Sequence, residues 1–248
     1  MIKIQKPVAP QVLIDNKVAW TQNLLDAIRI YGGYSKIPEP EKKSLLSHYR
    51  HNDIQTALSA SSHHKCAFCE CIPGESSHIE VEHFEPKSLY PDLAFEWDNL
   101  LPSCRICNEA KADADTRTNP IINPAIEAPE QLLTYSFLQI KPLEGSGQEQ
   151  KAQQTIDVCN LNCERLYNAR ATLMKAITEY IDELKDKINW ISEADTDQKR
   201  RVRITKLKNS LAIIDSLTTA ESAFSGYAKW FIQQYSEYQE AKRIAASR

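Results

Sequence analysis

Four cysteines in two CxxC pairs are the residues with the clearest chemical potential: Cys66, Cys69, Cys104 and Cys107. Each CxxC turn places two sulfurs on one side of a knuckle, and two such turns supply the four thiolates of a tetrahedral zinc site. The chain has seven cysteines, and an odd number argues against a complete disulfide framework. A site with four sulfur ligands has no open position for a substrate, so we predict a structural zinc ion.

Thirty-four residues separate the two pairs, which is longer than a compact zinc ribbon usually allows. The intervening segment contains Glu82-His83 and Asn99, and Asn108 directly follows the second pair. A carboxylate, an imidazole and two amides can hold a cation and activate water. We therefore expect this insertion to carry the chemistry and the cysteines to hold it in place.

The elements that must position these groups can be predicted from their patterns. Residues 77–84 alternate like a strand, and residues 95–101 bring the chain back. A helix from about Ser103 would place Cys104, Asn108 and Lys111 on one face at i, i+4 and i+7. The predicted product is strand, loop, strand and helix, pinned by zinc at each end.

This arrangement resembles the HNH endonucleases of the ββα-metal group. The residues that carry the resemblance are Cys66, Cys69, Glu82, His83, Asn99, Cys104, Cys107, Asn108 and Lys111. More narrowly, the strings at 65–70, 81–87 and 122–124 look like the PtuB-type HNH component of Septu anti-phage systems, which also occurs as an effector in some retron systems. The core of the resemblance covers about residues 65–124, with weaker similarity towards residue 170.

The resemblance implies roles for four residues. His83 falls at the position of the general base, and an unperturbed histidine pKa near 6.5 suits proton transfer at neutral pH. Glu82, where many HNH enzymes carry Asp, and Asn108 fall at the ligand positions of a catalytic cation. Their oxygen donors favour Mg²⁺ or Mn²⁺ over zinc. Asn99 matches the asparagine that braces the loop carrying the base.

Lys87 and Lys111 are placed by the resemblance to contact substrate phosphate. Simpler interpretations remain for several residues. Lys111 could be an ordinary surface lysine, and Asn99 is also a common turn residue. His63-His64 could replace zinc ligands, although a solvated loop is the simpler reading.

The function implied is a metal-dependent endonuclease that serves as an effector of an anti-phage defence system. The implied partners are a PtuA-type ATPase and, in retron systems, a reverse transcriptase with its DNA. DNA is the expected substrate. RNA, such as a tRNA, is an alternative, because attack by activated water does not use the 2′-hydroxyl. A non-catalytic zinc module that docks a partner protein is a third possibility.

Charge is unevenly distributed along the chain. Residues 1–65 carry a net charge of +4, residues 66–118 carry −7, and residues 119–248 are neutral. A free-standing nucleic-acid binder usually has a basic patch over its site. The acidic candidate segment therefore predicts weak activity for the isolated chain.

The composition, 42% hydrophobic residues and only six glycines in 248, indicates a helix-rich globular protein without a glycine-rich phosphate loop. No apolar run approaches the roughly 18 residues of a membrane helix, and the first residues lack the apolar core of a signal peptide. We expect a cytoplasmic protein with no membrane association.

The predicted fold class is α+β and mostly helical. An N-terminal helical segment at 1–61 and a C-terminal region at 125–248 flank a zinc-stabilised ββα-metal (HNH) core at 62–124. Outside this core, we predict a strand at 133–141 with a turn at 144–147, and helices at 15–31, 39–60, 150–159, 162–192, 196–218 and 219–246.

Particular residues mark the ends of these helices. Asp15 or Asn16 is the predicted cap of the first helix and Gly32-Gly33 its stop, while Thr196 and Thr219 are predicted caps near the C-terminus. The helix at 196–218 is amphipathic, with a basic outer face. That face is either a solvated surface or a docking surface for nucleic acid or a partner.

Overall fold

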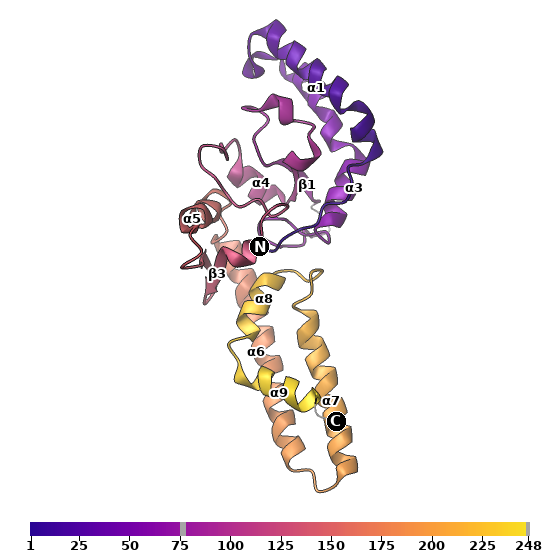
Figure 1. The fold of residues 1–248 in the computed structure, drawn as a ribbon, viewed down its shortest axis with the longest axis vertical. Coiled ribbons are helices and arrows are strands. Elements are labelled where there is room, and N and C mark those ends of the chain that lie inside the picture. Colours follow the sequence, from indigo (N-terminus) through magenta and orange to yellow (C-terminus); the bar gives the residue numbers. More distant parts are fainter. Residues whose placement is uncertain (75–77, 247–248) are drawn as a thin grey trace. The chain divides into compact units, whose positions relative to one another are not determined.

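A computed structural model describes residues 1–74 and 78–246 of the chain (Figure 1). The chain divides into two compact units. Unit 1 comprises residues 1–134 and 140–162, and unit 2 comprises residues 135–139 and 163–248. Among the described residues, no helix combines the length and apolar composition that a membrane span requires.

Helix α1 (Gln11–Tyr31) opens unit 1 and ends as predicted at Gly32. This glycine adopts φ 73°, and its N–H donates to the carbonyl of Ile28. The predicted start near Asp15 is wrong, because the Pro10 carbonyl already accepts the N–H groups of Leu13 and Ile14. Residues 11–14, which were expected to precede the helix, therefore belong to it.

The predicted helix at 39–60 is broken in two. Helix α2 (Glu39–Leu46) continues as the 3₁₀ turn η2 (Ser47–Arg50), and α3 (Asn52–Ser61) begins after His51. His51 has an extended backbone, with φ −55° and ψ 140°, and its ring accepts the N–H of Asp53. The side chain of His51 therefore caps a new helix where periodicity alone suggested continuity.

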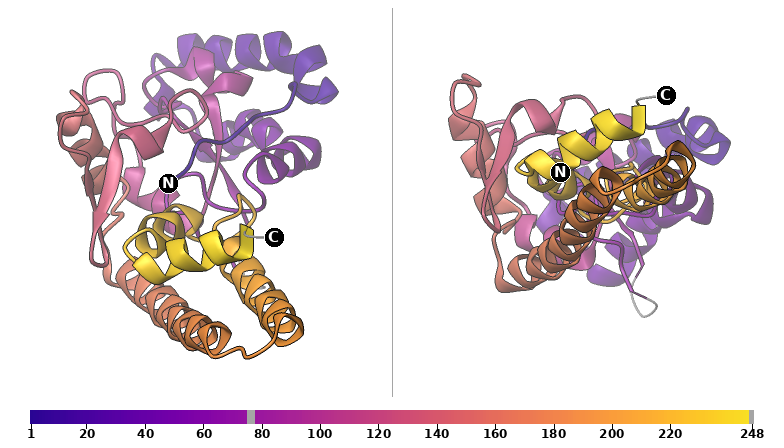
Figure 2. Two further views of the ribbon diagram at one scale, coloured as in Figure 1. Left: turned by 60° about the horizontal axis from the view of Figure 1, so that its bottom comes forward. Right: turned by 90° about the horizontal axis from the view of Figure 1, so that it is seen from below.

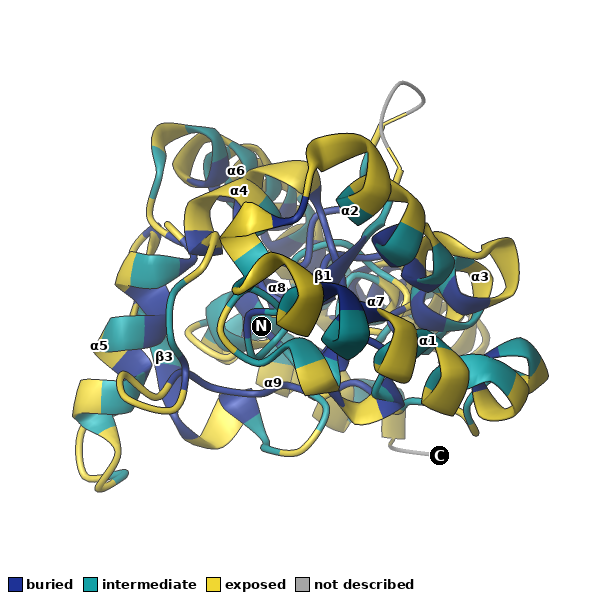
Figure 3. Cartoon of the chain, turned by 90° about the horizontal axis from the view of Figure 1, so that it is seen from above, coloured by how far each residue is buried: buried dark blue, intermediate teal, exposed yellow. Residues whose placement is uncertain are grey.

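The stretch between the two CxxC pairs and the helix after it fold in the predicted order of strand, loop, strand and helix. The returning strand covers 100–103 instead of 95–101, because residues 97–99 form a 3₁₀ turn. Strand β1 (Glu80–His83) pairs antiparallel with β2 (Leu100–Ser103), and α4 (Arg105–Lys111) follows directly. The register sets Glu80 opposite Ser103 and His83 opposite Leu100. β1 is drawn largely in the buried colour in Figure 3. The predicted start of this strand at Ser77 lies outside the described residues.

One hydrophobic core joins the N-terminal helices to this ββα element. Leu24 of α1, Ile54 of α3, Phe95 of the intervening loop and Leu100 of β2 are completely buried in the same cluster. Residues 1–61 and 62–124, predicted as separate domains, therefore share one unit. The shared core is the physical reason, since neither part encloses these side chains alone.

The predicted strand at 133–141 is a hairpin. Strands β3 (Leu133–Ser136) and β4 (Gln139–Pro142) form a two-stranded sheet, and Phe137 turns the chain with φ 55°. Gly145 and Gly147 also adopt positive φ in the predicted turn. Helix α5 (Glu149–Val158) follows.

Unit 2 is a helical bundle. Helices α6 (Glu164–Ser192) and α7 (Asp197–Ser216) lie side by side, as Figure 2 shows, and α8 (Ser225–Ile232) and α9 (Ser236–Ala246) pack against them. Thr196 caps α7 as predicted, since its hydroxyl accepts the N–H of Lys199 at 3.2 Å. The predicted helix at 219–246 and its cap at Thr219 are wrong. α8 begins only after Phe224, which has φ 54°, and the chain breaks again before α9.

The basic face of α7 has contacts within its own unit. Lys199 pairs with Asp195 at 2.8 Å, and the charged groups of Arg203 and Lys206 lie 4.5 and 5.0 Å from the centre of the Trp190 ring. These partners agree with the interpretation of α7 as a solvated helix that packs through its apolar stripe.

Candidate functional site

The four cysteines of the two CxxC pairs converge as predicted. Their sulfur atoms all lie within 4.8 Å of one another, and the four residues are buried. The sulfurs of Cys69 and Cys104 are 3.8 Å apart. A zinc ion with Zn–S bonds of about 2.3 Å would separate tetrahedral sulfurs by about 3.8 Å. The donor set therefore fits a metal such as zinc.

The electrostatics of the cluster also fit a bound cation. Burial raises the pKa of Cys66 well above its usual value. The pKa of Cys69 rises to about 12, chiefly through its hydrogen bond with Cys104. Four thiolates would repel one another in this buried space, whereas a divalent ion would compensate their charge.

The cysteines and histidines outside the two CxxC pairs differ in how close they lie to the four-cysteine cluster. Cys71, two residues after Cys69 in the sequence, places its sulfur 3.2 Å from that of Cys69. Cys159 is buried, while Cys163 is partly exposed. His63 and His64 are exposed and stand outside the cluster.

Strand β1 and helix α4 are joined by two polar contacts. The side-chain amide of Asn108 donates to Glu80 at 2.7 Å, and the ammonium of Lys111 pairs with Glu82 at 2.7 Å. Residues two apart on a strand share a face, so both carboxylates point towards the same helix. The structure thus brings Asn108 to Glu80, whereas the resemblance paired it with Glu82.

Lys111 does not lie where a substrate phosphate could reach it. Its side chain is completely inaccessible, and its ammonium also donates to the backbone carbonyl of His83 at 2.8 Å. Burial raises the pKa of Glu82, and the charge of Lys111 opposes that effect. The predicted phosphate contact of Lys111 is therefore replaced by an internal role, in which Lys111 ties α4 to the end of β1.

His83 is buried at the end of β1. Its Nε2 atom lies 2.9 Å from the backbone carbonyl of Ala94. Because a carbonyl only accepts hydrogen bonds, Nε2 carries the proton and Nδ1 keeps its lone pair. Burial, together with the nearby charge of Lys87, lowers the pKa of His83 to about 3. The imidazole is consequently neutral at neutral pH.

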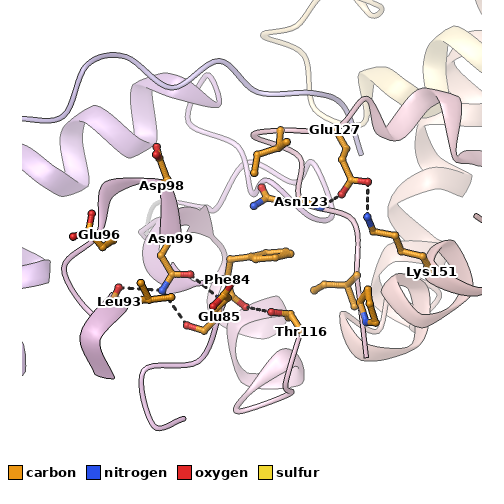
Figure 4. Close-up of a pocket in the computed structure, with 13 residues that line it drawn as sticks. Phe84, Glu85, Leu93, Glu96, Asp98, Asn99, Thr116, Asn123, Glu127 and Lys151 are labelled. Atoms are coloured by element: carbon orange, nitrogen blue, oxygen red, sulfur yellow. Dashed lines mark hydrogen bonds and ion pairs between the residues drawn. The ribbon is translucent and has the colours of Figure 1, made fainter. Parts of the chain in front are cut away.

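Asn99 connects the two ends of the loop that follows β1 (Figure 4). Its side-chain oxygen accepts the N–H of Glu85 at 2.7 Å, and its amide donates to the carbonyls of Glu85 and Leu93 at 3.0 and 3.1 Å. Leu93 immediately precedes Ala94, whose carbonyl holds His83. Asn99 thus fixes the loop that orients the imidazole.

A cavity of about 690 Å³ lies beside Asn99, and several of its lining residues are acidic (Figure 4). Three of these carboxylates have basic partners within unit 1. Glu85 pairs with Arg117 at 2.5 Å, Glu96 with Lys17 at 2.9 Å, and Glu127 with Lys151 at 2.5 Å. Three of the carboxylates beside this cavity are therefore compensated locally.

A second cavity, of about 450 Å³, lies at the face that β1 shares with α4. Its lining includes Glu80, Lys87 and Asn108, together with Tyr49 and Arg50 from η2. His83 lies behind this lining, with its ring perpendicular to that of Tyr49 and the ring centres 4.6 Å apart. This cavity gathers a carboxylate, an amide and cations beside a buried imidazole, which makes it the candidate active site.

Comparison with known proteins supports the Septu PtuB part of the resemblance. No protein-family model matches the chain. The chain is 34% identical over 186 residues to Septu protein PtuB of Bacillus thuringiensis, an alignment that covers 74% of this chain and 64% of that protein. It is 24% identical to Septu protein PtuB of Bacillus mycoides (strain KBAB4), over 90% of this chain and 85% of that protein. The chain is similar to Septu proteins of the PtuB type. The alignment spans just under two thirds of the first relative's length.

Among the cavity residues that were not selected from the sequence are Tyr49, Arg50 and Glu80. Glu80 could have been, because the alternation of β1 places it on the same face as Glu82. Tyr49 and Arg50 had no such signal, since they precede the first CxxC pair and lie in a segment that read as continuous helix. Only the break at His51 and the shared core bring η2 to β1.

Proposed function

We propose that this protein is a metal-dependent endonuclease of the HNH type and a component of an anti-phage defence system. The similarity to proteins named Septu protein PtuB supports the role in defence. The observation that carries the nuclease proposal is the second cavity. There a cysteine-pinned strand–strand–helix element places Glu80, Lys87 and Asn108 in front of His83.

The residues present fit a hard divalent cation such as Mg²⁺ or Mn²⁺. Glu80, Glu82 and Asn108 would hold it, because carboxylate and amide oxygens are the donors these ions prefer. Asn108 already lies 2.7 Å from Glu80, and Glu82 uses one oxygen for Lys111. When bound, the cation would stabilise negative charge on the phosphate and on the leaving oxygen.

His83 would act as the general base. Its Nδ1 lone pair would take a proton from a water molecule as that water attacks phosphorus. Burial keeps the imidazole neutral, although the lowered pKa also makes it a weaker base than a free histidine, and the Ala94 carbonyl together with Asn99 fixes its orientation. Breakage of the bond to the 3′ oxygen would leave a 5′-phosphate and a 3′-hydroxyl, as the resemblance implies.

DNA is the proposed substrate, with RNA as the alternative, since the same attack serves both. We propose a PtuA-type ATPase as the partner, on the basis of the relatives' names. A retron reverse transcriptase with its DNA is the further partner that the resemblance implies where the protein serves a retron. The cytoplasm is the proposed compartment, because thiolate ligands persist in reducing conditions.

The test is expression of the chain beside its neighbouring operon genes, followed by sequencing of the nucleic acids cleaved in the cell. Wild type should produce cleaved ends, whereas His83→Ala should produce none and should retain zinc and a native fold. His64→Ala is the matched control, because His64 is exposed and lies outside both the cysteine cluster and the cavity.

A non-catalytic zinc module predicts a different result. His83→Ala would then preserve protection against phage, and Cys104→Ser alone would destroy it by unfolding unit 1. Protection that survives His83→Ala at the wild-type level would thus reject the nuclease proposal. Cleaved ends that map to RNA in the active samples would instead select the alternative substrate.

A further inference from the structure

The N-terminal helical segment reaches the candidate active site through two consecutive residues. Tyr49 and Arg50 end the turn η2, and both line the cavity that contains Glu80, Lys87 and Asn108. They lie outside the region on which the resemblance to HNH enzymes rests. The segment around η2 therefore contributes side chains to the site as well as packing to the core.

The cationic groups of two side chains lie near the ring of Tyr49. The guanidinium carbon of Arg50 lies 5.3 Å from the ring centre, and the ammonium nitrogen of Lys87 lies 5.6 Å from it. Both distances are within the roughly 6 Å over which a cation is attracted to an aromatic ring. Tyr49 itself is buried, so it is a fixed platform, while Arg50 remains exposed and Lys87 half-buried.

These two cations differ from the other basic residues around β1. Lys111, Lys17 and Arg117 each form an ion pair with a carboxylate. Across residues 1–74 and 78–246, neither Arg50 nor Lys87 has a carboxylate within ion-pair distance. Their charge is therefore not compensated within the described chain.

The sign of the charge at the cavity is the reverse of that counted along the sequence. The segment 66–118 has a net charge of −7. Among the described residues that line the cavity, however, one carboxylate, Glu80, stands beside two cations, Arg50 and Lys87. The compensated carboxylates of this segment lie elsewhere. Such a local excess of positive charge attracts a polyanion even on an acidic protein.

We propose that Arg50 and Lys87 form a two-cation clamp for a backbone phosphate of the nucleic acid, next to Glu80 and Asn108. This inference rests on the proposed function and adds a substrate-binding residue from the N-terminal segment. The planar guanidinium of Arg50 suits paired hydrogen bonds to two phosphate oxygens, and Lys87 supplies a point charge. The Tyr49 ring restricts both side chains before the substrate arrives.

The test is equilibrium binding of the full-length chain to a labelled DNA duplex and a labelled RNA hairpin over a range of potassium chloride concentrations. No divalent cation is added, so that cleavage does not intervene. Arg50→Gln and Lys87→Gln should each weaken binding at least about tenfold at low salt. Each should also reduce the slope of log Kd against log salt by about 0.9 for the duplex. Arg29→Gln is the control, since Arg29 is an exposed arginine of α1 that already pairs with Asp26.

Two outcomes would overturn the clamp. One is a salt slope for Arg50→Gln equal to that of wild type, and the other is an absence of wild-type binding to both probes. A parallel cleavage assay with magnesium and the operon partner separates this proposal from the nuclease proposal. Wild type that binds with the predicted slopes but never cleaves would reject the nuclease and retain the clamp. Wild type that cleaves, with Arg50→Gln unchanged in KM and in salt slope, would reject only the clamp.

Discussion

The buried pair between Lys111 and Glu82 leads to a quantitative prediction. Its side chains are 0% and 5% exposed, the charged atoms are 2.7 Å apart, and Lys111 also donates to the His83 carbonyl. Lys111→Met would leave the Glu82 carboxylate buried without its partner. Removal of one member of a buried pair costs about 3–5 kcal/mol, so we expect unit 1 to lose that much stability.

A matched exposed pair provides the control. Lys17 and Glu96 are 2.9 Å apart, and each side chain is 40% exposed. Because water screens such pairs, Lys17→Met should cost only about 0.2–1 kcal/mol. The double variant Lys111→Met/Glu82→Met removes both buried charges, and apolar replacement of a whole buried pair is often neutral. It should therefore recover most of the stability lost in Lys111→Met.

The assay is urea unfolding of the zinc-loaded protein at neutral pH. In a background with Trp190 and Trp230 changed to phenylalanine, fluorescence reports on Trp20 and Trp97, which both belong to unit 1. Equal costs for Lys111→Met and Lys17→Met would refute the reasoning. If Lys111→Met instead kept its stability and lost affinity for nucleic acid, Lys111 would be the phosphate contact that the resemblance implies.

Three further predictions concern other parts of the chain. Cys104→Ser, or removal of zinc by a strong chelator, should unfold unit 1 and leave the far-ultraviolet helical signal of unit 2; unchanged thermal unfolding after verified zinc loss would contradict a structural metal. Burial lowers the pKa of Lys6 to about 8, so the folded state binds fewer protons than the unfolded state between about pH 8 and 10.5, and stability should rise with pH across that window. Lys6→Met should remove this rise, worth roughly 2 kcal/mol, in urea titrations at pH 7.5 and 10, and an identical pH dependence in the two proteins would disprove it. Tyr227→Phe should be neutral or stabilise unit 2 by up to about 1 kcal/mol in thermal unfolding, because the buried Tyr227 hydroxyl has no hydrogen-bond partner among the described residues. A loss of stability would show that the hydroxyl is satisfied.

Features with local causes were predictable from the sequence. Gly32 ends α1 because glycine accepts the left-handed backbone there, and Thr196 caps α7 through its own hydroxyl. The convergence of the cysteines followed from zinc chemistry, which demands four ligands wherever the chain places them. Local predictions failed where a single residue overrode a periodic pattern, as at His51 within 39–60 and at Phe137 within 133–141.

The sequence by itself determined which chemically active residues the candidate segment contains and the order of its strands and helix. It also placed Glu80 and Glu82 on one strand face and supported the similarity to Septu protein PtuB. Only the tertiary structure decided which side chains of the site contact one another. Packing of α4 on β1 sets Asn108 against Glu80 and buries Lys111 against Glu82, because the rotation of a helix over a strand depends on the whole core. The same core brings Arg50 to the cavity. The cavity is basic because Arg50 and Lys87 lie close together in space, and a count of charges along the chain contains no such information.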